Sequence, residues 1–327
     1  MALYQNRFGR LALVNLAIAV AIALAYAAER LPRARVLVWS VPLAIFALDP
    51  AFHFYARPAP AGPLPAEVEA GAFLRAHARP ARVGQRSGVL TPWDMSHFVV
   101  RYAERPVTAT GFGFYIGPDS FDRVERLWLG AEPALAAFMR ERDLGYVMQG
   151  ANGYESKVLR GRGAFVADGA GRVGLNPDWF KALPLSPLLL GGSGLSAHGV
   201  RHLERLLPLH ASRSAVAESF PLPRLWVYEQ VRGATLRGRA APGTLVRLRQ
   251  PLRARGFAAD HEAWTRAAED GSFALVTPLP AGYRGDGIET APSAELFAGA
   301  RVIAEPALTE AQVRGGETIT IDAPPAQ

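Results

Sequence analysis

Trp93 and Asp94 are adjacent residues whose side chains can together satisfy a small hydroxyl group. The indole N–H of tryptophan only donates a hydrogen bond, and an ionised carboxylate only accepts one. A serine or threonine hydroxyl between them would use both capacities, and a ligand without that hydroxyl would leave buried polar groups unpaired. The alternative is structural, with Trp93 in the core and Asp94 capping the following helix. The pair therefore predicts either a hydroxyl-selective binding site or an ordinary helix start.

Two other candidates for chemistry have weaker spacing. His198 and His202 are four residues apart, so on a helix they would share a face as two metal ligands do. The zinc-protease pattern needs a glutamate directly after its first histidine, but Gly199 stands there. Ser193 lies in a glycine-rich stretch, but the residue two places on is Leu195 rather than the glycine of a nucleophile elbow. These residues favour surface, packing or loop roles.

A glycine-rich stretch and an acidic group complete the candidates. Residues 111–117 lack the GxGxxG spacing of a dinucleotide-binding turn, and no strand-to-helix unit surrounds them. Asp119, Asp122 and Glu125 would form an acidic face on a helix, but capping and solvation explain such charges. Neither group predicts a phosphate or metal site.

The composition of the 327 residues bounds the class of protein. Half of the residues are hydrophobic, which suffices for a packed core and excludes disorder as the main state. No cysteine is present, so disulfides, thiolate nucleophiles and cysteine-ligated zinc are excluded. The formal net charge is +7, but the basic excess is concentrated in residues 1–60, around apolar segments rather than on a folded face with aromatic residues. We therefore predict no nucleic-acid partner.

The elements that must position the Trp-Asp pair begin with two apolar segments. Residues 11–28 are interrupted only by Asn15, and at about 1.5 Å per residue they cover nearly the whole hydrocarbon thickness of a bilayer. A second apolar segment, 36–48, reaches about twenty residues if it continues to Tyr55. Both segments predict transmembrane helices that form a hairpin.

The charges around the hairpin predict its orientation. Three arginines in the loop 29–35 place that loop in the cytoplasm by the positive-inside rule, so both ends of the hairpin face outward. Arg7 and Arg10 before the first segment, together with Ala25-Tyr26-Ala27, leave a signal peptide as the alternative to the first span. We expect a multi-pass protein of the inner membrane whose soluble part faces the periplasm or exterior.

The pattern of the whole chain predicts a multi-domain membrane protein. Its regions are a transmembrane helical hairpin at 1–57, a proline-rich linker at 58–65, a mixed α/β domain at 66–221, and a C-terminal β-sandwich at 222–327. In the α/β domain we expect a strand at 144–148 and helices at 66–78, 97–103, 133–142 and 197–207. The β-type runs of the last region are 225–230, 245–248, 273–277 and 318–321.

The Trp-Asp stretch resembles the sequon-reading WWDYG motif of the prokaryotic oligosaccharyltransferase catalytic subunit family. Residues 92–96, PWDMS, are similar to the motif, and residues 103–107, AERPV, are similar to the AxRPV turn that follows it. The other segments similar to the C-terminal half of that subunit are 132–147, 225–234, 270–273, 310–321 and the opening Gln5-Asn6-Arg7-Phe8. The resemblance spans nearly the whole chain, and the Trp-Asp stretch is its most specific part.

The resemblance implies transfer of a glycan from a lipid-pyrophosphate carrier to the amide nitrogen of asparagine in Asn-X-Ser/Thr. Trp93 and Asp94 would then bind the Ser/Thr hydroxyl of the acceptor, and Arg7 would neutralise the leaving pyrophosphate. The implied partners are membrane lipid, a lipid-linked oligosaccharide and an acceptor polypeptide. A divalent metal, Mg²⁺ or Mn²⁺, is implied for the complete enzyme.

The sequence departs from the family pattern in two ways. Pro92 replaces the first tryptophan of the motif, and Met95 and Ser96 replace its tyrosine and glycine. The family's metal-binding and asparagine-activating carboxylates lie among earlier membrane helices, whereas only Glu29 and Asp49 precede residue 60 here. We therefore expect no catalytic residue and no bound metal in this chain alone, and a missing N-terminal multi-span half or subunit as its partner.

Two other hypotheses remain open. In the first, the chain is a non-catalytic, membrane-anchored protein that binds peptide or glycan. In the second, it is an inactive gene fragment. A binding protein predicts peptide affinity that depends on the hydroxyl, without turnover at any metal concentration.

Overall fold

The computed structural model describes residues 26, 29–30, 65–77, 88–92, 95–108, 118–150, 165–167, 173–217 and 220–322. The chain divides into two compact units, Met1–Gly62 and Pro63–Gln327. Both predicted membrane segments and the predicted linker lie almost entirely outside the described residues. Among the residues that are described, no helix is long and apolar enough to cross a membrane.

A four-stranded sheet organises the first part of the second unit. Its strand order is β1 (Gly88–Leu90), β2 (Leu144–Gly150), β8 (Leu225–Gln230) and β5 (Leu206–Ala211). Strand β1 runs parallel to β2, whereas β8 runs antiparallel to both β2 and β5. The prediction that 225–230 opens the C-terminal β-sandwich is wrong, because this strand lies inside the four-stranded sheet. Its apolar run indicates a strand but not the sheet in which the strand pairs.

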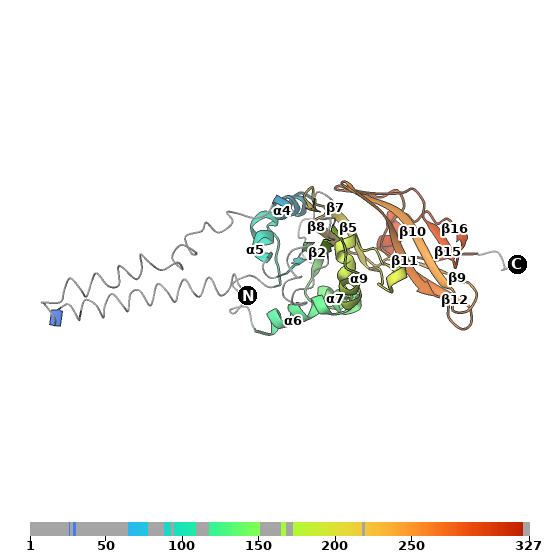
Figure 1. Ribbon diagram of the computed structural model, residues 1–327, viewed down its shortest axis with the longest axis horizontal. Helices are drawn as coiled ribbons and strands as arrows, with labels where there is room; N and C mark the ends of the chain where they lie inside the picture. Colours follow the sequence, from blue (N-terminus) through green and yellow to red (C-terminus); the bar gives the residue numbers. More distant parts are fainter. Residues whose placement is uncertain are drawn as a thin grey trace. The chain divides into compact units, whose positions relative to one another are not determined.

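Side chains alternate across this sheet, so each face has its own hydrophobic layer. Helix α4 (Pro65–His77) packs on the face that carries Tyr146. Helix α7 (Glu132–Glu141) packs on the opposite face, which carries the next residue, Val147. Figure 1 shows α4 and α7 on the two sides of β2 and β8. This part of the chain is therefore a mixed α/β layer structure, as the sequence predicts.

The chain after β1 forms the short helix α5 (Ser96–Phe98) and the π-helical turn η2 (Val99–Ala103). The turn lies against α4, because a Cβ atom on Gly71 would be 2.5 Å from Tyr102 Cβ. Glycine at this position of α4 therefore permits the close approach of the two elements. Val107 then returns to the sheet as a parallel bridge with β1.

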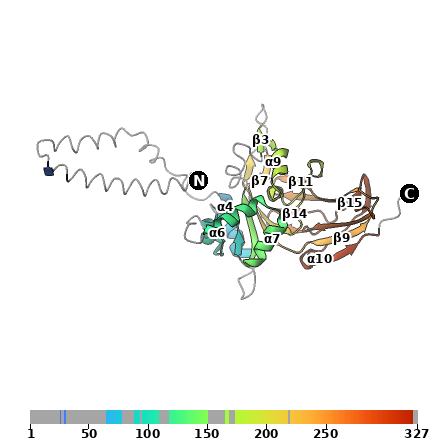
Figure 2. The same ribbon diagram turned by 90° about the horizontal axis from the view of Figure 1, so that it is seen from below.

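Two sheets form the C-terminal region. The larger contains β13 (Arg284–Gly285), β14 (Ile288–Thr290), β10 (Leu245–Ala254), β15 (Glu295–Ala298) and β16 (Arg301–Ala304), with β11 (Phe257–Arg266) also paired to β10. The smaller contains β12 (Ser272–Thr277), β9 (Ala234–Arg239) and β17 (Thr318–Thr320). Buried side chains of both sheets belong to one hydrophobic core. Figure 2 shows α10 (Glu310–Gly315) beside β9.

The remaining elements connect these layers. They are α6 (Pro118–Leu129), β3 (Phe165–Ala167), β4 (Val173–Leu175), α9 (Pro177–Ala182), η4 (Ser186–Leu190), η5 (Ser196–His198), β6 (Ala215–Ala217) and β7 (Phe220–Pro223). The helix predicted at 197–207 is wrong. The 3-10 turn η5 ends at Gly199, which has a φ of 72° and stops the helix, and strand β5 begins at Leu206.

Candidate functional site

The structure describes the flanks of the predicted acceptor site. Trp93, Asp94 and Arg7 lie outside the described residues. Pro92 is buried two residues after β1, and Met95 N donates a hydrogen bond to Pro92 O at 3.0 Å. The two flanking residues are therefore held to each other at the end of a strand of the central sheet.

Two motif positions at which this chain departs from the family are packing positions. Met95 is 5% exposed and belongs to the hydrophobic layer between α4 and the sheet. Its Cε atom would lie 3.5 Å from a Cβ atom on Gly150, so the methionine fills the space beside the end of β2. Ser96 is fully buried at the start of α5. Both side chains are buried, so the two departures from the family motif change the packing beneath residues 92–96 and present no side chain to solvent.

Thr91 places a hydroxyl beside the motif. Its side chain is buried, and Oγ1 has no hydrogen-bond partner among the described residues. A buried polar group without a partner costs about 1–3 kcal/mol. The residue that joins β1 to the motif therefore has hydrogen-bonding capacity that the described part of the fold does not use.

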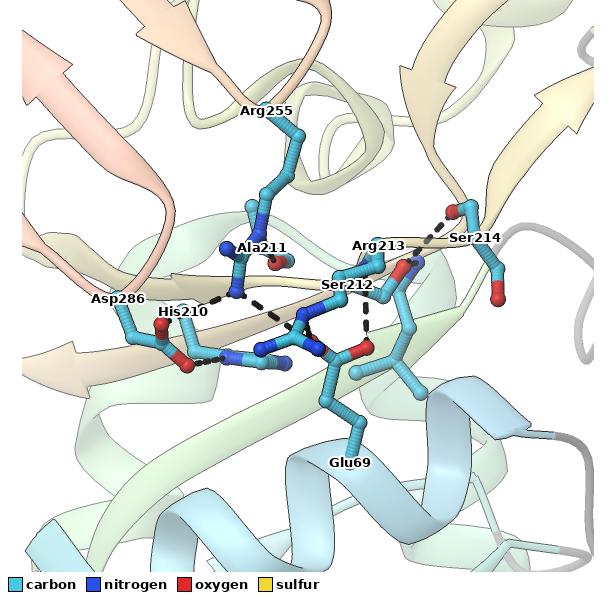
Figure 3. Close-up of polar contacts among 9 residues, drawn as sticks. Glu69, His210, Ala211, Ser212, Arg213, Ser214, Arg255 and Asp286 are labelled. Carbon is cyan, nitrogen blue, oxygen red and sulfur yellow. Dashed lines mark hydrogen bonds and ion pairs between the residues drawn. The ribbon is translucent and has the colours of Figure 1, made fainter.

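A group of charged side chains joins α4, β5 and the C-terminal region (Figure 3), and we call Glu69, His210, Arg255 and Asp286 the charged cluster. His210 Nδ1 lies 2.8 Å from Asp286 Oδ2. Arg255 Nη2 lies 3.0 Å from Asp286 Oδ1 and 3.3 Å from Glu69 Oε1. Figure 3 shows Glu69 pointing from α4 toward the arginines and His210 lying beside Asp286. One guanidinium therefore bridges two carboxylates from distant parts of the chain.

The backbone around the cluster fixes the arginine. Arg255 has a φ of 56°, in the left-handed region, and its Nε donates to Ala211 O at 3.0 Å. A Cβ atom on Gly287 would collide with the Arg255 guanidinium, so glycine at this position lets the side chain pass. Arg213 N donates to Glu69 Oε2 at 2.9 Å, which holds the carboxylate from the other side.

The electrostatics of the cluster follow from this geometry. Burial lowers the pKa of His210, and the hydrogen bond to Asp286 only partly offsets that effect. The neutral ring donates from Nδ1, which leaves Nε2 as a buried acceptor without a partner among the described residues. Burial raises the pKa of Asp286, but the hydrogen bond from His210 and the charge of Arg255 outweigh it and lower the pKa overall. Asp286 is therefore ionised at neutral pH, and the Arg255 guanidinium balances its charge.

The charged cluster has the donor set of a metal site but does not fit a metal ion. One ligand atom each from Glu69, His210 and Asp286 lie within 4.8 Å of one another, and such a set can coordinate a divalent cation. The Arg255 guanidinium, however, already contacts both carboxylates and supplies the positive charge that a cation would bring. The cluster is a charge-balanced connection between α4 and the C-terminal region.

The histidine and serine candidates from the sequence have structural roles. His198 is exposed, whereas His202 is buried with Nε2 2.7 Å from Val276 O and Nδ1 accepting from Trp264 N at 3.2 Å. Both nitrogens of His202 are used, so the two histidines do not form a metal site. Ser193 is buried, and its Oγ hydrogen-bonds only to backbone atoms among the residues described here.

The other polar groups noted in the sequence are not described. Residues 111–117 and the side chains of Asp119, Asp122 and Glu125 lie outside the described part of the structure. The charged cluster, by contrast, was missed because its four members come from four separate segments of the chain. No spacing in the sequence brings Glu69 to Asp286, and only the isolated histidine at 210 in an apolar strand could have drawn attention to it.

Comparisons with known proteins identify the C-terminal region and the fold. Residues 233–319 match the family model described as the archaeal glycosylation protein B long peripheral domain. No curated protein matches the chain. The archaeal oligosaccharyltransferase AglB from Archaeoglobus fulgidus, solved with an inhibitory peptide and a dolichol-phosphate, has a similar structure with a TM-score of 0.68 and 15% identity. The similarity covers 94% of this chain and 50% of that one.

Two further Archaeoglobus fulgidus oligosaccharyltransferase structures have the same fold. One, tethered to an acceptor peptide containing the NVT sequon, has a TM-score of 0.63 and 15% identity over 92% of this chain and 50% of its own. The other, in complex with Zn and sulfate, has a TM-score of 0.64 and 14% identity over 92% and 52%. The chain spans about half the length of these structures. The resemblance to the C-terminal part of the oligosaccharyltransferase family that the sequence predicts is therefore confirmed.

Proposed function

We propose that the chain is the acceptor-recognising C-terminal portion of a membrane oligosaccharyltransferase, which transfers a lipid-pyrophosphate-linked glycan to asparagine in Asn-X-Ser/Thr. The observation that carries this proposal is the match of residues 233–319 to the long peripheral domain of the archaeal glycosylation protein. The fold similarity over 94% of the chain extends it to the segment with the Trp-Asp pair.

In this proposal, Trp93 and Asp94 bind the Ser/Thr hydroxyl of the acceptor. Their neighbours support the assignment, because Pro92 and Met95 are buried and hydrogen-bonded to each other at 3.0 Å. The solved relative with a tethered NVT sequon peptide is consistent with an acceptor polypeptide as the partner.

The membrane assignments also belong to this proposal. The two apolar segments within residues 1–57 form a hairpin that holds the rest of the chain at the outer surface of the inner membrane, facing the periplasm or exterior. Arg7 then lies near the surface, where its guanidinium pairs with the pyrophosphate of the lipid-linked oligosaccharide. The dolichol-phosphate in the solved AglB complex supports a polyprenyl-type carrier as the lipid partner.

Catalysis in the complete enzyme requires a divalent metal, Mg²⁺ or Mn²⁺, together with carboxylates from a multi-span half. The charged cluster does not supply that site, since Arg255 occupies the position between its carboxylates. No reaction step is therefore assigned to described residues of this chain. Its part is to position the acceptor asparagine, which lowers the entropic component of the barrier.

A peptide-binding experiment on the full chain in detergent tests the acceptor site. A labelled Asn-Ala-Thr peptide should bind about tenfold more tightly than Asn-Ala-Val, because valine has the shape of threonine without the hydroxyl. Asp94→Ala should remove that preference, whereas Asp178→Ala, which changes an exposed aspartate, should retain it. Equal binding of the two peptides by the unaltered chain would refute the site.

A transfer assay separates the enzyme from the binding protein that is the alternative. In the alternative, the chain binds the hydroxyl of the acceptor peptide without transferring glycan. In membranes that contain lipid-linked glycan, the enzyme proposal expects Asp94→Ala to lower transfer to an Asn-X-Thr peptide by at least about tenfold, or ~1.4 kcal/mol. Hydroxyl-dependent binding with no transfer at any Mg²⁺ or Mn²⁺ concentration would establish the binding protein instead.

A further inference from the structure

A cleft of about 520 Å³ lies among α4, the central sheet, β13 and α10, within the second unit. Its volume is in the range of about 300–1,000 Å³ that is typical of small-molecule sites, and it exceeds what a bare inorganic anion needs. The polar side chains that line the cleft are His77, Glu229, Tyr283, Arg284, Asp286 and Arg314. We call this cavity the α4–α10 cleft.

Three of these polar side chains are already held by ion pairs. Arg314 Nη1 lies 2.6 Å from Glu229 Oε2, and Arg314 Nε lies 2.7 Å from Glu310 Oε1. Asp286 belongs to the charged cluster and contacts Arg255 and His210. These pairs fix part of the wall and leave it close to neutral, so they define the shape of the α4–α10 cleft rather than its charge preference.

Arg284 is different, because no described residue forms a hydrogen bond or an ion pair with its exposed guanidinium. Its neighbour across the strands is Glu289 of β14. The backbone beside Arg284 is fixed, since a Cβ atom on Gly285 would lie 2.7 Å from Leu209 O and β13 therefore runs directly against β5. A guanidinium without a partner favours a carboxylate, which it can bind through two parallel hydrogen bonds.

The neighbouring groups offer both donors and acceptors. His77 uses Nδ1 against Phe73 O at 3.2 Å, which leaves Nε2 for a ligand. Among the described residues, neither the Tyr283 hydroxyl nor Glu229 Oε1 has a hydrogen-bond partner. A hydroxyl both donates and accepts, so adjacent hydroxyl groups on a ligand match such a mixed wall better than an aliphatic acid does.

Aromatic rings supply the apolar surface of the α4–α10 cleft. Phe73 and His77 stack at 4.7 Å between ring centroids, and Tyr146 and Tyr283 also line the cavity. A ring-shaped ligand with an apolar face, several hydroxyl groups and one carboxylate would use all three features: the rings, the mixed polar wall and the unpaired guanidinium.

We propose that the α4–α10 cleft binds an acidic saccharide, with the sugar carboxylate on Arg284 and the sugar hydroxyls on Glu229, Tyr283 and His77. This site goes beyond the proposed function and does not depend on it. The acceptor pair lies in a different segment of the chain, so each site can fail while the other holds.

Ligand-observed NMR on the full chain in detergent tests the proposal. D-glucuronate should bind at least about tenfold more tightly than D-glucose, which has the same ring without the carboxylate, and more tightly than acetate, which has the carboxylate without the ring. Arg284→Gln should weaken D-glucuronate binding by about tenfold and leave the weak D-glucose binding unchanged. Tyr283→Phe, which removes one hydroxyl from the cleft, should weaken the binding of both D-glucuronate and D-glucose.

Arg301→Gln is the matched control, because Arg301 is an exposed arginine of β16 that does not line the cleft. It should leave D-glucuronate binding unchanged. Equal affinity for D-glucuronate and acetate would overturn the saccharide assignment. An equal loss of D-glucuronate affinity in Arg284→Gln and Arg301→Gln would show that the carboxylate responds only to the general surface charge and would overturn the role of Arg284. Absence of saturable D-glucuronate binding up to about 50 mM would overturn the site itself.

Discussion

Two regions of the molecule bury histidines in opposite electrostatic surroundings. His210 in the charged cluster has no exposed side-chain surface, yet Asp286 accepts its hydrogen bond and Arg255 and Glu69 balance the local charge. His261 in β11 and His202, which packs against β11 and β12 of the C-terminal region, are 1% and 5% exposed, and no carboxylate pairs with either of them among the described residues. The first region can accommodate charge, whereas the second depends on its histidines staying neutral.

The hydrogen bonds of His202 explain why it stays neutral. Burial lowers its pKa to about 4. Nε2 donates to Val276 O, and Nδ1 already accepts from Trp264 N, so a second ring proton would meet an N–H group. Burial lowers the pKa of His261 to about 3, with a further contribution from His202, and neither nitrogen of His261 has a partner among the described residues. The surrounding strands thus bury two imidazole rings, those of His202 and His261, which protonation at acid pH would charge.

Acid pH should therefore produce the largest effect. The unfolded chain binds a proton on each of these histidines near pH 6.5, whereas the folded chain does so only near pH 4 and pH 3. Stability should fall as the pH drops below 6.5, by about 2 kcal/mol per histidine at pH 5, because the unfolded state binds more protons. Urea denaturation of the full chain in detergent, followed by tryptophan fluorescence at pH 7.5 and pH 5, measures this. A free energy of unfolding that is equal at the two pH values would contradict it.

Removing the bridging guanidinium should have the next largest effect. Arg255→Ala leaves the Glu69 and Asp286 carboxylates without their shared partner, and we expect a loss of about 2 kcal/mol at pH 7. The side chains are partly exposed, so water limits the loss. Without Arg255 the pKa of Asp286 should rise, and protonation of Asp286 should relieve part of the destabilisation as the pH falls.

The control for this variant is Arg253→Ala. Arg253 is an exposed arginine of β10, two residues before Arg255 in the turn that follows this strand, and it lies outside the charged cluster. Its removal should change the free energy of unfolding by less than about 0.5 kcal/mol. A loss of the same size in both variants would show that the bridge adds nothing to the fold.

The same two regions show how much of the fold the sequence predicts. Among the C-terminal strands, the β-type runs predicted at 245–248, 273–277 and 318–321 correspond to the start of β10, to β12 and to β17. In β10 the buried residues are every second one from Val246 to Ala254. The helices predicted at 66–78 and 133–142 correspond to α4 and α7, and the strand predicted at 144–148 corresponds to β2. Local periodicity carries this information, so it is available from a single sequence.

The sequence does not predict contacts that depend on tertiary structure. Residues 225–230 begin with four apolar residues, which is typical of a strand, and only the pairing with β2 and β5 places them in the central sheet. The charged cluster joins Glu69 to Asp286 through no local spacing. The resemblance to the C-terminal part of the oligosaccharyltransferase family is confirmed by the match at residues 233–319 and by the fold, whereas the motif similarity at residues 92–96 stays a prediction. The roles of Trp93 and Asp94 stay predictions, since both residues lie outside the described part.

The smallest expected effect separates the two histidine environments most sharply. His261→Leu replaces a buried ring that has no hydrogen-bond partner among the described residues with an apolar side chain of similar volume. Removing an unsatisfied polar group should be neutral or stabilising by up to about 1 kcal/mol at pH 7. The variant should also lose about half of the destabilisation between pH 7.5 and pH 5, because one of the two titrating rings is gone.

His210→Leu is the comparison: it removes the hydrogen bond to Asp286 and should destabilise the chain at pH 7. An equal loss in the free energy of unfolding of His261→Leu and His210→Leu at pH 7 would mean that paired and unpaired histidines contribute alike to stability. The contrast between the two regions would then fail.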